Sequence, residues 1–229
     1  MNITGLQKLT LLDFPGKIAC TVFTSGCNFR CPFCHNASLV NGSNQENISE
    51  EEFFDFLDKR KGILEGVCIT GGEPTLQKDL KDFIIKVKSM GFLVKLDTNG
   101  YKPELLSDLI DSNLLDYVAM DIKNSKEKYG LTVDIENFDL APILKSIDIL
   151  INSKIEYEFR TTVVKELHNE SDIIKISEWI KNSKKYFLQG FIDSGDILNG
   201  SFNGYDENTM KNLLKLSQES IKHTELRGF

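Results

Sequence analysis

The feature that most constrains the fold of this chain is a regular alternation of short, β-rich apolar runs with helical segments. Strands that alternate with helices along a chain pair in parallel to form an α/β sheet. The sequence predicts six such strands, over residues 18–23, 67–70, 92–96, 117–120, 156–164 and 186–192. Six strand–helix units are too few to close an eight-stranded barrel. We therefore expect an α/β fold that is a partial, open (β/α)6 barrel with parallel strands. A flat, doubly wound sheet is the alternative.

The helices between these strands carry recognisable start and stop signals. Ser49, followed three residues later by Glu52, forms a capping-box pattern before a helix that carries Phe53. Pro103 is placed to begin a helix, and Gly91 is placed to end one. Further helices are expected around residues 80–87, 103–110, 143–151, 170–183 and 207–222. These signals support the strand–helix alternation from the helical side.

Composition narrows the class of protein further. The 229 residues are 41% hydrophobic and 27% charged, which fits one globular domain spanning residues 1–229. The formal net charge of -7 argues against general nucleic-acid binding, which requires a basic surface. No apolar run is long enough to span a membrane, and the N-terminal residues lack the pattern of a signal peptide. We therefore expect a cytoplasmic protein.

Cysteine, glycine and charged residues follow the carboxyl ends of the predicted strands. They are Ser25–Cys27, Gly71–Pro74, Asp97–Gly100, Asp121–Lys123 and, at the sixth strand, Gln189–Phe191. In parallel α/β folds, ligands bind at this edge of the sheet. We therefore expect these residues to contribute to one site.

The cysteine motif carries the most specific chemical information. Cys27, Cys31 and Cys34 form a CxxxCxxC pattern, and in a cytosolic protein such clustering indicates a metal site rather than disulfides. A four-cysteine cluster site or a closed structural zinc site needs a fourth ligand, and no further cysteine lies nearby. Cys20 and Cys68 fall inside predicted strands, so we interpret them as buried core residues. Three thiolates would leave one metal position open for a substrate.

The alternative interpretation of this motif is a zinc ion bound by the three cysteines and His35. It requires Cys34 and His35, which are adjacent in the chain, to turn onto the same metal ion. Neighbouring residues rarely do so, and we therefore favour the cluster.

With an aromatic residue, Phe33, before its last cysteine, the motif resembles the signature of the radical S-adenosylmethionine superfamily. Gly71-Gly72-Glu73-Pro74 is similar to the second motif of that superfamily. Cys34-His35-Asn36-Ala37, Asp97-Thr98-Asn99-Gly100 and Asp121-Ile122-Lys123 resemble the activating enzymes of glycyl radical enzymes. Three further segments resemble the activating proteins of anaerobic ribonucleoside-triphosphate reductase: Leu12 to Lys17, Phe159 to Val164 and Glu225 to Gly228.

This resemblance implies a mechanism and a set of roles. Cys27, Cys31 and Cys34 would ligate a 4Fe-4S cluster that reduces S-adenosylmethionine to methionine and a 5′-deoxyadenosyl radical, which abstracts hydrogen from a glycine of the partner. The cofactor-binding residues implied by the resemblance are Phe33, Gly71, Gly72, Glu73, Asp97, Thr98, Asp121, Lys123 and Arg160. The implied partners are a glycyl radical enzyme and a flavodoxin- or ferredoxin-type electron donor.

Each implied role has a structural alternative. The ring of Phe33 could anchor its loop, and Gly71 and Gly72 could serve only a turn. On the ligand-binding interpretation, a larger residue at Gly72 would block the cofactor and leave the cluster intact. Lys123 would pair with the cofactor carboxylate or lie on the surface, and Arg160 requires an anionic partner because its strand is apolar.

Asp97 and Asp121 could each cap the turn that follows. In some pyruvate formate-lyase activating enzymes the matching carboxylates hold a monovalent cation, and the hard oxygen atoms of these two residues suit such an ion. The sequence leaves open whether this chain binds one.

Some features of the related enzymes are not found in this sequence. Pyruvate formate-lyase activating enzymes carry a histidine near the end of the sixth strand, where this chain has Gln189 to Phe191. His168 and His223 are interpreted as surface residues.

The polar loop from Leu39 to Asn47 is predicted to be exposed and to contact the partner. A different glycyl radical enzyme, a small-molecule substrate or a simple electron carrier are the alternative functions.

Overall fold

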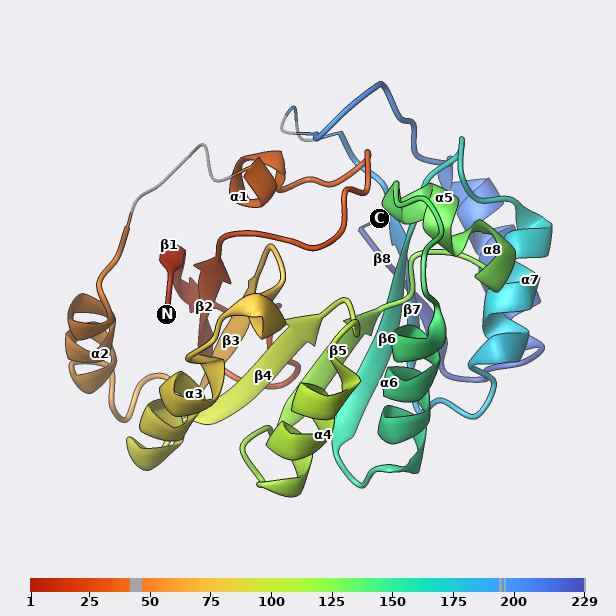
Figure 1. Ribbon diagram of the computed structural model, residues 1–229. Coiled ribbons are helices and arrows are strands. Elements are labelled where there is room, and N and C mark those ends of the chain that lie inside the picture. The colour runs from red at the N-terminus through yellow and green to blue at the C-terminus, as the bar shows by residue number, and fades with distance from the viewer. Residues whose placement is uncertain (42–46, 194, 196, 229) are drawn as a thin grey trace. The chain divides into compact units, whose positions relative to one another are not determined.

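The computed structural model (Figure 1) describes residues 1–41, 47–193, 195 and 197–228. The chain divides into two compact units. The first unit comprises residues 1–28, 38–119 and 154–156, and the second comprises residues 29–37, 120–153 and 157–229. The boundary at residues 28 and 29 falls inside the cysteine motif, so Cys27 belongs to the first unit and Cys31 and Cys34 belong to the second.

The first unit is built on four neighbouring strands. They are β1 (Ile3–Thr10), β2 (Ala19–Thr24), β3 (Gly66–Gly71) and β4 (Leu93–Thr98). Strand β1 pairs antiparallel with β2, whereas β2, β3 and β4 are parallel, with Cys20 opposite Val67 and Val67 opposite Val94. Most residues of β2 and β3 are buried, as expected for parallel strands that are covered on both faces.

The helices of the first unit begin and end where the sequence predicts. Ser49 caps α2 (Glu50–Asp58) in a complete capping box with Glu52. Helix α3 (Leu80–Ser89) is followed by Gly91 with a positive φ of 91°, and α4 (Pro103–Asp111) has its proline in the first turn. The turn after β3 continues into a short 3-10 helix, η1 (Pro74–Leu76).

The second unit carries the remaining strands. Strand β5 (Tyr117–Asp121) begins in the first unit and ends in the second, and β6 (Glu156–Val163), β7 (Tyr186–Gly190) and β8 (Thr224–Arg227) follow. Strands β6, β7 and β8 are parallel neighbours. The helices are η2 (Lys126–Lys128), α5 (Tyr129–Val133), α6 (Ala141–Asn152), α7 (Glu170–Trp179) and α8 (Glu207–Gln218). Helices α7 and α8 lie side by side and are joined by a 2.8 Å hydrogen bond from the Ser177 hydroxyl to the Ser217 hydroxyl (Figure 1).

The predicted α/β class and the six strand–helix units are confirmed. Strands β2 to β7 are the six predicted strands, and the described residues add β1 before them and β8 after them. Strand β1 does not show the alternation of buried apolar and exposed polar residues that would predict a strand, because three consecutive residues, Gln7, Lys8 and Leu9, are exposed. Helix α7 ends at Trp179 and helix α8 at Gln218, earlier than predicted, because a non-helical connection separates each helix from the strand that follows it.

Two expectations from the sequence are not confirmed by the structure: the exposed loop from Leu39 to Asn47 and the single domain. The segment from Leu39 to Asn47 begins in α1 (Ala37–Asn41), and its residues 42–46 lie outside the described residues. The expectation of a single domain over residues 1–229 stays a prediction. No helix in the described part of the chain is long and apolar enough to cross a membrane.

Candidate active site

The first unit presents Cys27 at the end of a tightly held backbone segment after β2. The Gly26 amide donates to the Leu39 carbonyl oxygen at 2.9 Å, and the Glu73 amide donates to the Gly26 carbonyl oxygen at 2.7 Å. The Asn99 side-chain amide lies 4.0 Å from the Cys27 sulfur and donates to the Asn28 side-chain oxygen at 2.8 Å. The side chain of Cys27 is half-buried. Asn99 thus contacts the motif, although it was not among the implied cofactor-binding residues.

Residues 71 and 72 are glycines because two backbone segments approach each other closely at these positions. Gly71 has a φ of 123°, and a Cβ atom there would lie 2.3 Å from the Thr24 amide nitrogen. A Cβ atom on Gly72 would lie 2.0 Å from the Gly26 carbonyl oxygen. A larger residue at Gly72 would therefore displace the segment that leads into Cys27. The expectation that it would leave the cluster intact is not supported by this geometry.

Glu73 links the ends of β3 and β4 within the first unit. Its buried carboxylate accepts hydrogen bonds from the Thr75 amide (3.1 Å), the Thr75 hydroxyl (2.5 Å), the Thr98 hydroxyl (2.8 Å) and the Asn99 amide (2.6 Å). Burial raises the pKa of this carboxyl group, and the hydrogen bonds counteract part of that increase. Glu73 therefore orders Thr98 and Asn99, and any contact that it makes to a cofactor stays a prediction.

Asp97 also has a protein partner within the first unit. It forms an ion pair with Lys95, whose side chain is 2% exposed. The sulfur of Cys68 lies 3.8 Å from both the Lys95 amine and the Asp97 carboxylate. An unpaired charge at this depth would be costly, so the pair explains how Lys95 is accommodated in the core.

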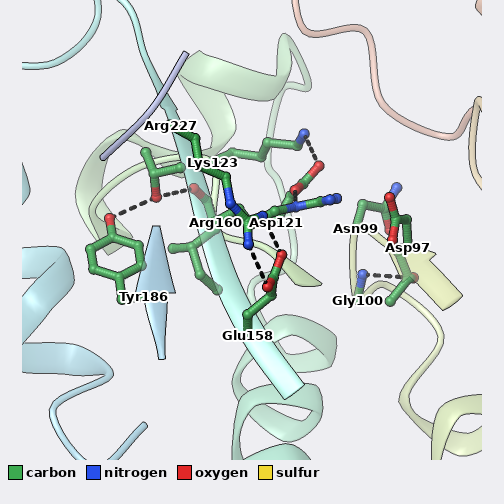
Figure 2. A network of polar contacts seen from close by, with 12 residues as sticks. Asp97, Asn99, Gly100, Asp121, Lys123, Glu158, Arg160, Tyr186 and Arg227 are labelled. Atoms are coloured by element: carbon green, nitrogen blue, oxygen red, sulfur yellow. Dashed lines mark hydrogen bonds and ion pairs between the residues drawn. The ribbon is translucent and has the colours of Figure 1, made fainter. Parts of the chain in front are cut away.

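The second unit holds a cationic cluster formed by Asp121 at the end of β5, Lys123 just after it and Arg160 within β6. Asp121 accepts from the Lys123 amine at 3.0 Å and from the Arg160 Nε at 2.9 Å (Figure 2). Burial opposes ionisation of Asp121, but Arg160 and then Lys123 outweigh it and lower the pKa of this carboxyl group. The anionic partner that Arg160 requires is therefore a protein carboxylate. Two cations share one carboxylate, so the trio carries a net positive charge.

The same trio lies close to two of the motif cysteines. Burial would lower the pKa of Lys123, but Asp121, Cys31 and Cys34 together raise it above its ordinary value. Cys31 is 6% exposed, Cys34 is half-buried, and the Cys34 amide donates to the Cys31 carbonyl oxygen at 3.0 Å. Lys123 therefore lies within electrostatic range of Cys31 and Cys34.

The donor set of the motif fits an iron–sulfur cluster. No group of three or more Cys, His, Asp and Glu side chains in the described residues is arranged to hold a single metal ion. Burial raises the pKa of the Cys20 thiol to about 12, which fits a core residue rather than a metal ligand. Cys20 and Cys68 are fully buried, as the sequence predicts.

His35 takes part in packing, which does not favour the zinc interpretation. Its ring lies 4.9 Å from the ring of Phe191, and burial lowers the pKa of the imidazole. The ring of Phe33 is 3% exposed and packs edge-on against Phe202 at 6.3 Å. This packing matches the loop-anchor alternative for the Phe33 ring, and a contact of Phe33 with the cofactor stays a prediction.

His168 is buried, so the prediction that it is a surface residue is wrong. Its Nδ1 accepts from the Val164 amide at 3.1 Å, and its Nε2 donates to the Lys123 carbonyl oxygen at 2.8 Å. Burial lowers the pKa of this imidazole and keeps it neutral. His168 therefore fixes the backbone at Lys123, a role that no sequence pattern around it indicated. His223 is exposed, as predicted.

The C-terminal strand of the second unit is fastened by a second ion pair. Arg227 of β8 donates from both terminal nitrogens to the carboxylate of Glu158 on β6, at 2.5 and 2.8 Å (Figure 2). Its guanidinium carbon lies 3.4 Å from the centre of the Phe187 ring on β7. Glu158 is 1% exposed, and without Arg227 it would be a buried charge lacking this partner. The Glu225 to Gly228 segment thus has a structural function.

Comparisons with known proteins identify the family to which this chain is similar. The sequence model of the radical SAM superfamily, where SAM denotes S-adenosylmethionine, matches residues 21–180. A protein of Methanocaldococcus jannaschii, assigned as a glycyl-radical enzyme activating enzyme, is 34% identical over 98% of this chain and 95% of its own. The pyruvate formate-lyase-activating enzyme of Clostridium pasteurianum is 28% identical over 79% of this chain and 76% of its own.

Solved structures agree on the fold. A domain of the pyruvate-formate lyase-activating enzyme from Bacteroides vulgatus matches with a TM-score of 0.59 and 18% identity, covering 71% of this chain and 99% of that domain. SuiB of Streptococcus suis, solved with its precursor peptide, matches with a TM-score of 0.70 and 16% identity, covering 91% of this chain and 48% of SuiB. These likenesses support the partial-barrel fold.

Proposed function

This chain belongs to the radical SAM superfamily, and we propose that it installs a glycyl radical on a partner enzyme, most specifically anaerobic ribonucleoside-triphosphate reductase. The observation that carries the activase assignment is the 34% identity, over nearly the full length of both chains, to a protein assigned as a glycyl-radical enzyme activating enzyme. Members of the superfamily use a 4Fe-4S cluster and S-adenosylmethionine, so the chain is an enzyme rather than a simple electron carrier.

In this proposal, Cys27, Cys31 and Cys34 hold three irons of the cluster. When bound, the cluster supplies one electron to the sulfonium of S-adenosylmethionine, and cleavage gives methionine and a 5′-deoxyadenosyl radical. Transfer of a hydrogen atom from the glycine of the partner to that radical yields 5′-deoxyadenosine and the glycyl radical.

The residues of the chain bind and orient the cofactor in this reaction. Lys123 is proposed to meet the cofactor carboxylate, because the Asp121, Lys123 and Arg160 trio carries a net positive charge. The backbone of Gly71 and Gly72 is proposed to lie near the cofactor amine, with Thr98 ordered beside it by Glu73. Asp97 and Asp121 already have cationic protein partners, so the structure offers no specific support for a monovalent cation.

The choice of ribonucleotide reductase as partner is supported by three sequence segments. Two of them have structural roles that this choice does not explain: Phe14 packs against Tyr117 at 6.2 Å, and Arg227 holds Glu158. They support kinship with the reductase activating proteins more than direct recognition of a partner. The identity to the Clostridium pasteurianum enzyme favours pyruvate formate-lyase as the second candidate partner.

The deciding experiment mixes the reconstituted protein anaerobically with each candidate partner, S-adenosylmethionine and a one-electron reductant such as reduced flavodoxin. Electron paramagnetic resonance measures the glycyl radical, and chromatography measures 5′-deoxyadenosine. We expect about one deoxyadenosine for each glycyl radical on the reductase. A glycyl radical on pyruvate formate-lyase alone would show that pyruvate formate-lyase, and not the reductase, is the partner. Cleavage of S-adenosylmethionine with no radical on either enzyme would count against both candidates.

A further inference from the structure

The cysteine loop, defined as residues 29–35, is contacted within the second unit by aromatic residues from much later in the chain. We propose that Phe191 and Phe202 are positioning residues that hold the cysteine loop in place for cluster binding. With residues 199–204 they form what we call the aromatic strap. This role is independent of which partner the enzyme activates.

Contacts from the aromatic strap reach both sides of Cys34. The ring of Phe202 packs edge-on against Phe33, at 6.3 Å and an interplanar angle of 73°, and against Phe191, at 6.5 Å and 74°. The ring of Phe191 lies 4.9 Å from that of His35. Edge-to-face pairs at such separations stabilise a structure beyond the burial of their area.

A backbone hydrogen bond reinforces the aromatic contacts. The Asn199 amide donates to the Pro32 carbonyl oxygen at 3.0 Å. Together with the ring contacts, it connects the strap to Pro32, Phe33 and His35, three of the four loop residues that follow Cys31. The strap therefore restrains the part of the loop that contains Cys34.

The strap is itself anchored to other parts of the second unit. The Asn203 carbonyl oxygen accepts from the Lys165 amide at 2.9 Å, and the Asn203 amide and side chain donate to Glu166 at 3.0 and 2.8 Å. Tyr205, two residues after Asn203, donates a hydrogen bond from its hydroxyl to the His168 carbonyl oxygen at 2.9 Å. The strap therefore holds the loop against the segment that links β6 to α7.

The N-terminal side of the cysteine loop is held by a different segment. The Arg30 amide donates to the Val133 carbonyl oxygen at 3.0 Å, and Phe29 packs edge-on against Phe138 at 5.5 Å. Cys31 thus lies between two restraints, one before it and one after it. Ordering a backbone costs conformational entropy, so a loop that is held before it binds metal avoids part of that cost on binding.

The strap also accounts for a feature in which the sequence differs from pyruvate formate-lyase activating enzymes. Where those enzymes carry a histidine, this chain has Gln189 to Phe191, and Phe191 contacts His35 of the cysteine motif. The segment therefore supports the metal-binding loop through packing.

The test compares Phe202→Ala and Phe191→Ala with the wild-type protein after anaerobic reconstitution. Loss of iron to a chelator is followed by the cluster absorbance, without added S-adenosylmethionine or partner. We expect iron loss to be about tenfold faster in each variant, because a freed loop opens more often. Phe202→Tyr keeps the edge-on ring and should behave as wild type. Phe54→Ala, which removes a half-buried aromatic residue from α2 in the first unit, is the matched control.

A second measurement separates a local effect from general unfolding. In the iron-free protein, iodoacetamide labelling of each cysteine is followed by mass spectrometry. We expect Phe202→Ala to increase the labelling rate of Cys31 about tenfold, while the fully buried Cys20 and Cys68 stay protected. Wild-type rates of both iron loss and Cys31 labelling in Phe202→Ala would overturn the proposal. An equal increase at Cys20, Cys31 and Cys68 would also overturn it, since the effect would then be global.

Discussion

Glu73 in the first unit and Asp121 in the second are both carboxylates at strand ends, but their surroundings differ. Glu73 is surrounded by neutral donors, namely two backbone amides and two threonine hydroxyls, and burial raises its pKa. Asp121 lies between Lys123 and Arg160, which lower its pKa against the effect of burial. The first arrangement joins strand ends, and the second presents a net positive charge. The comparison teaches that carboxylates at similar sequence positions join strand ends in one unit and hold two cations in the other.

The largest effect is expected from removing one motif cysteine in each unit. Cys27→Ala in the first unit and Cys31→Ala in the second should each abolish cluster binding and cleavage of S-adenosylmethionine, because each removes one of only three proposed iron ligands. Iron content and 5′-deoxyadenosine formation measure the outcome. Cys20→Ala and Cys68→Ala are the controls, and they should keep activity with some loss of stability. The ligand assignment would be wrong if Cys68→Ala lost the cluster and Cys27→Ala retained it.

The contrast between the two carboxylates is tested by Asp121→Asn and Glu73→Gln. Asp121→Asn removes the charge that orients Lys123, and we expect the Kd for S-adenosylmethionine to rise about tenfold. Glu73→Gln leaves some of its donors without an acceptor, and we expect the free energy of unfolding to fall by about 1–3 kcal/mol. Binding titrations and urea unfolding of both variants give the comparison. Normal affinity of Asp121→Asn for S-adenosylmethionine would contradict the proposed role of Asp121 in orienting Lys123.

Gly72→Ala tests how closely the Gly-Gly-Glu-Pro turn is coupled to Cys27. The added Cβ would lie 2.0 Å from the Gly26 carbonyl oxygen, so we expect a loss of about 2 kcal/mol in stability and faster iron release. Gly5→Ala is a matched control, because its Cβ would lie 3.4 Å from the Phe23 ring, an ordinary contact. Thermal unfolding and iron content are the measurements. A stable Gly72→Ala protein with full iron content would show that the turn can shift without affecting the motif.

The smallest effect concerns the pH dependence of stability, which should have opposite signs for the two carboxylates. The folded-state pKa of Glu73 is raised above its ordinary value of 4.5, so the folded protein takes up this proton first and the Glu73 contribution grows as pH falls. The folded-state pKa of Asp121 is lowered below 3.8, so its contribution is present above that pH and is lost on stronger acidification.

Urea unfolding of the iron-free protein between about pH 3 and 7 measures these contributions as differences between wild type and variant. The difference between wild type and Glu73→Gln should increase toward acid, and the difference between wild type and Asp121→Asn should decrease. Differences that change in the same direction for both variants would contradict the contrast between the two sites.

The sequence by itself determined the order of the elements and the chemistry of the cysteine motif. Apolar runs such as residues 67–70 and the capping box at Ser49 are local signals, and the structure confirms both. The alternation of strands and helices also fixed which residues follow each strand end. The class of cofactor followed from the resemblance of the Cys27, Cys31 and Cys34 motif to the signature of the radical SAM superfamily, and the family match supports it.

Only the tertiary structure decided which polar groups meet. The pairing of Glu158 with Arg227 joins residues 69 positions apart, and the contact of His168 with the Lys123 carbonyl oxygen spans 45 positions. The reason that Gly72 must be glycine is likewise a backbone segment more than forty residues away, around Gly26. No local pattern encodes such pairings, because the energy of a buried polar group depends on the partner that the fold brings to it.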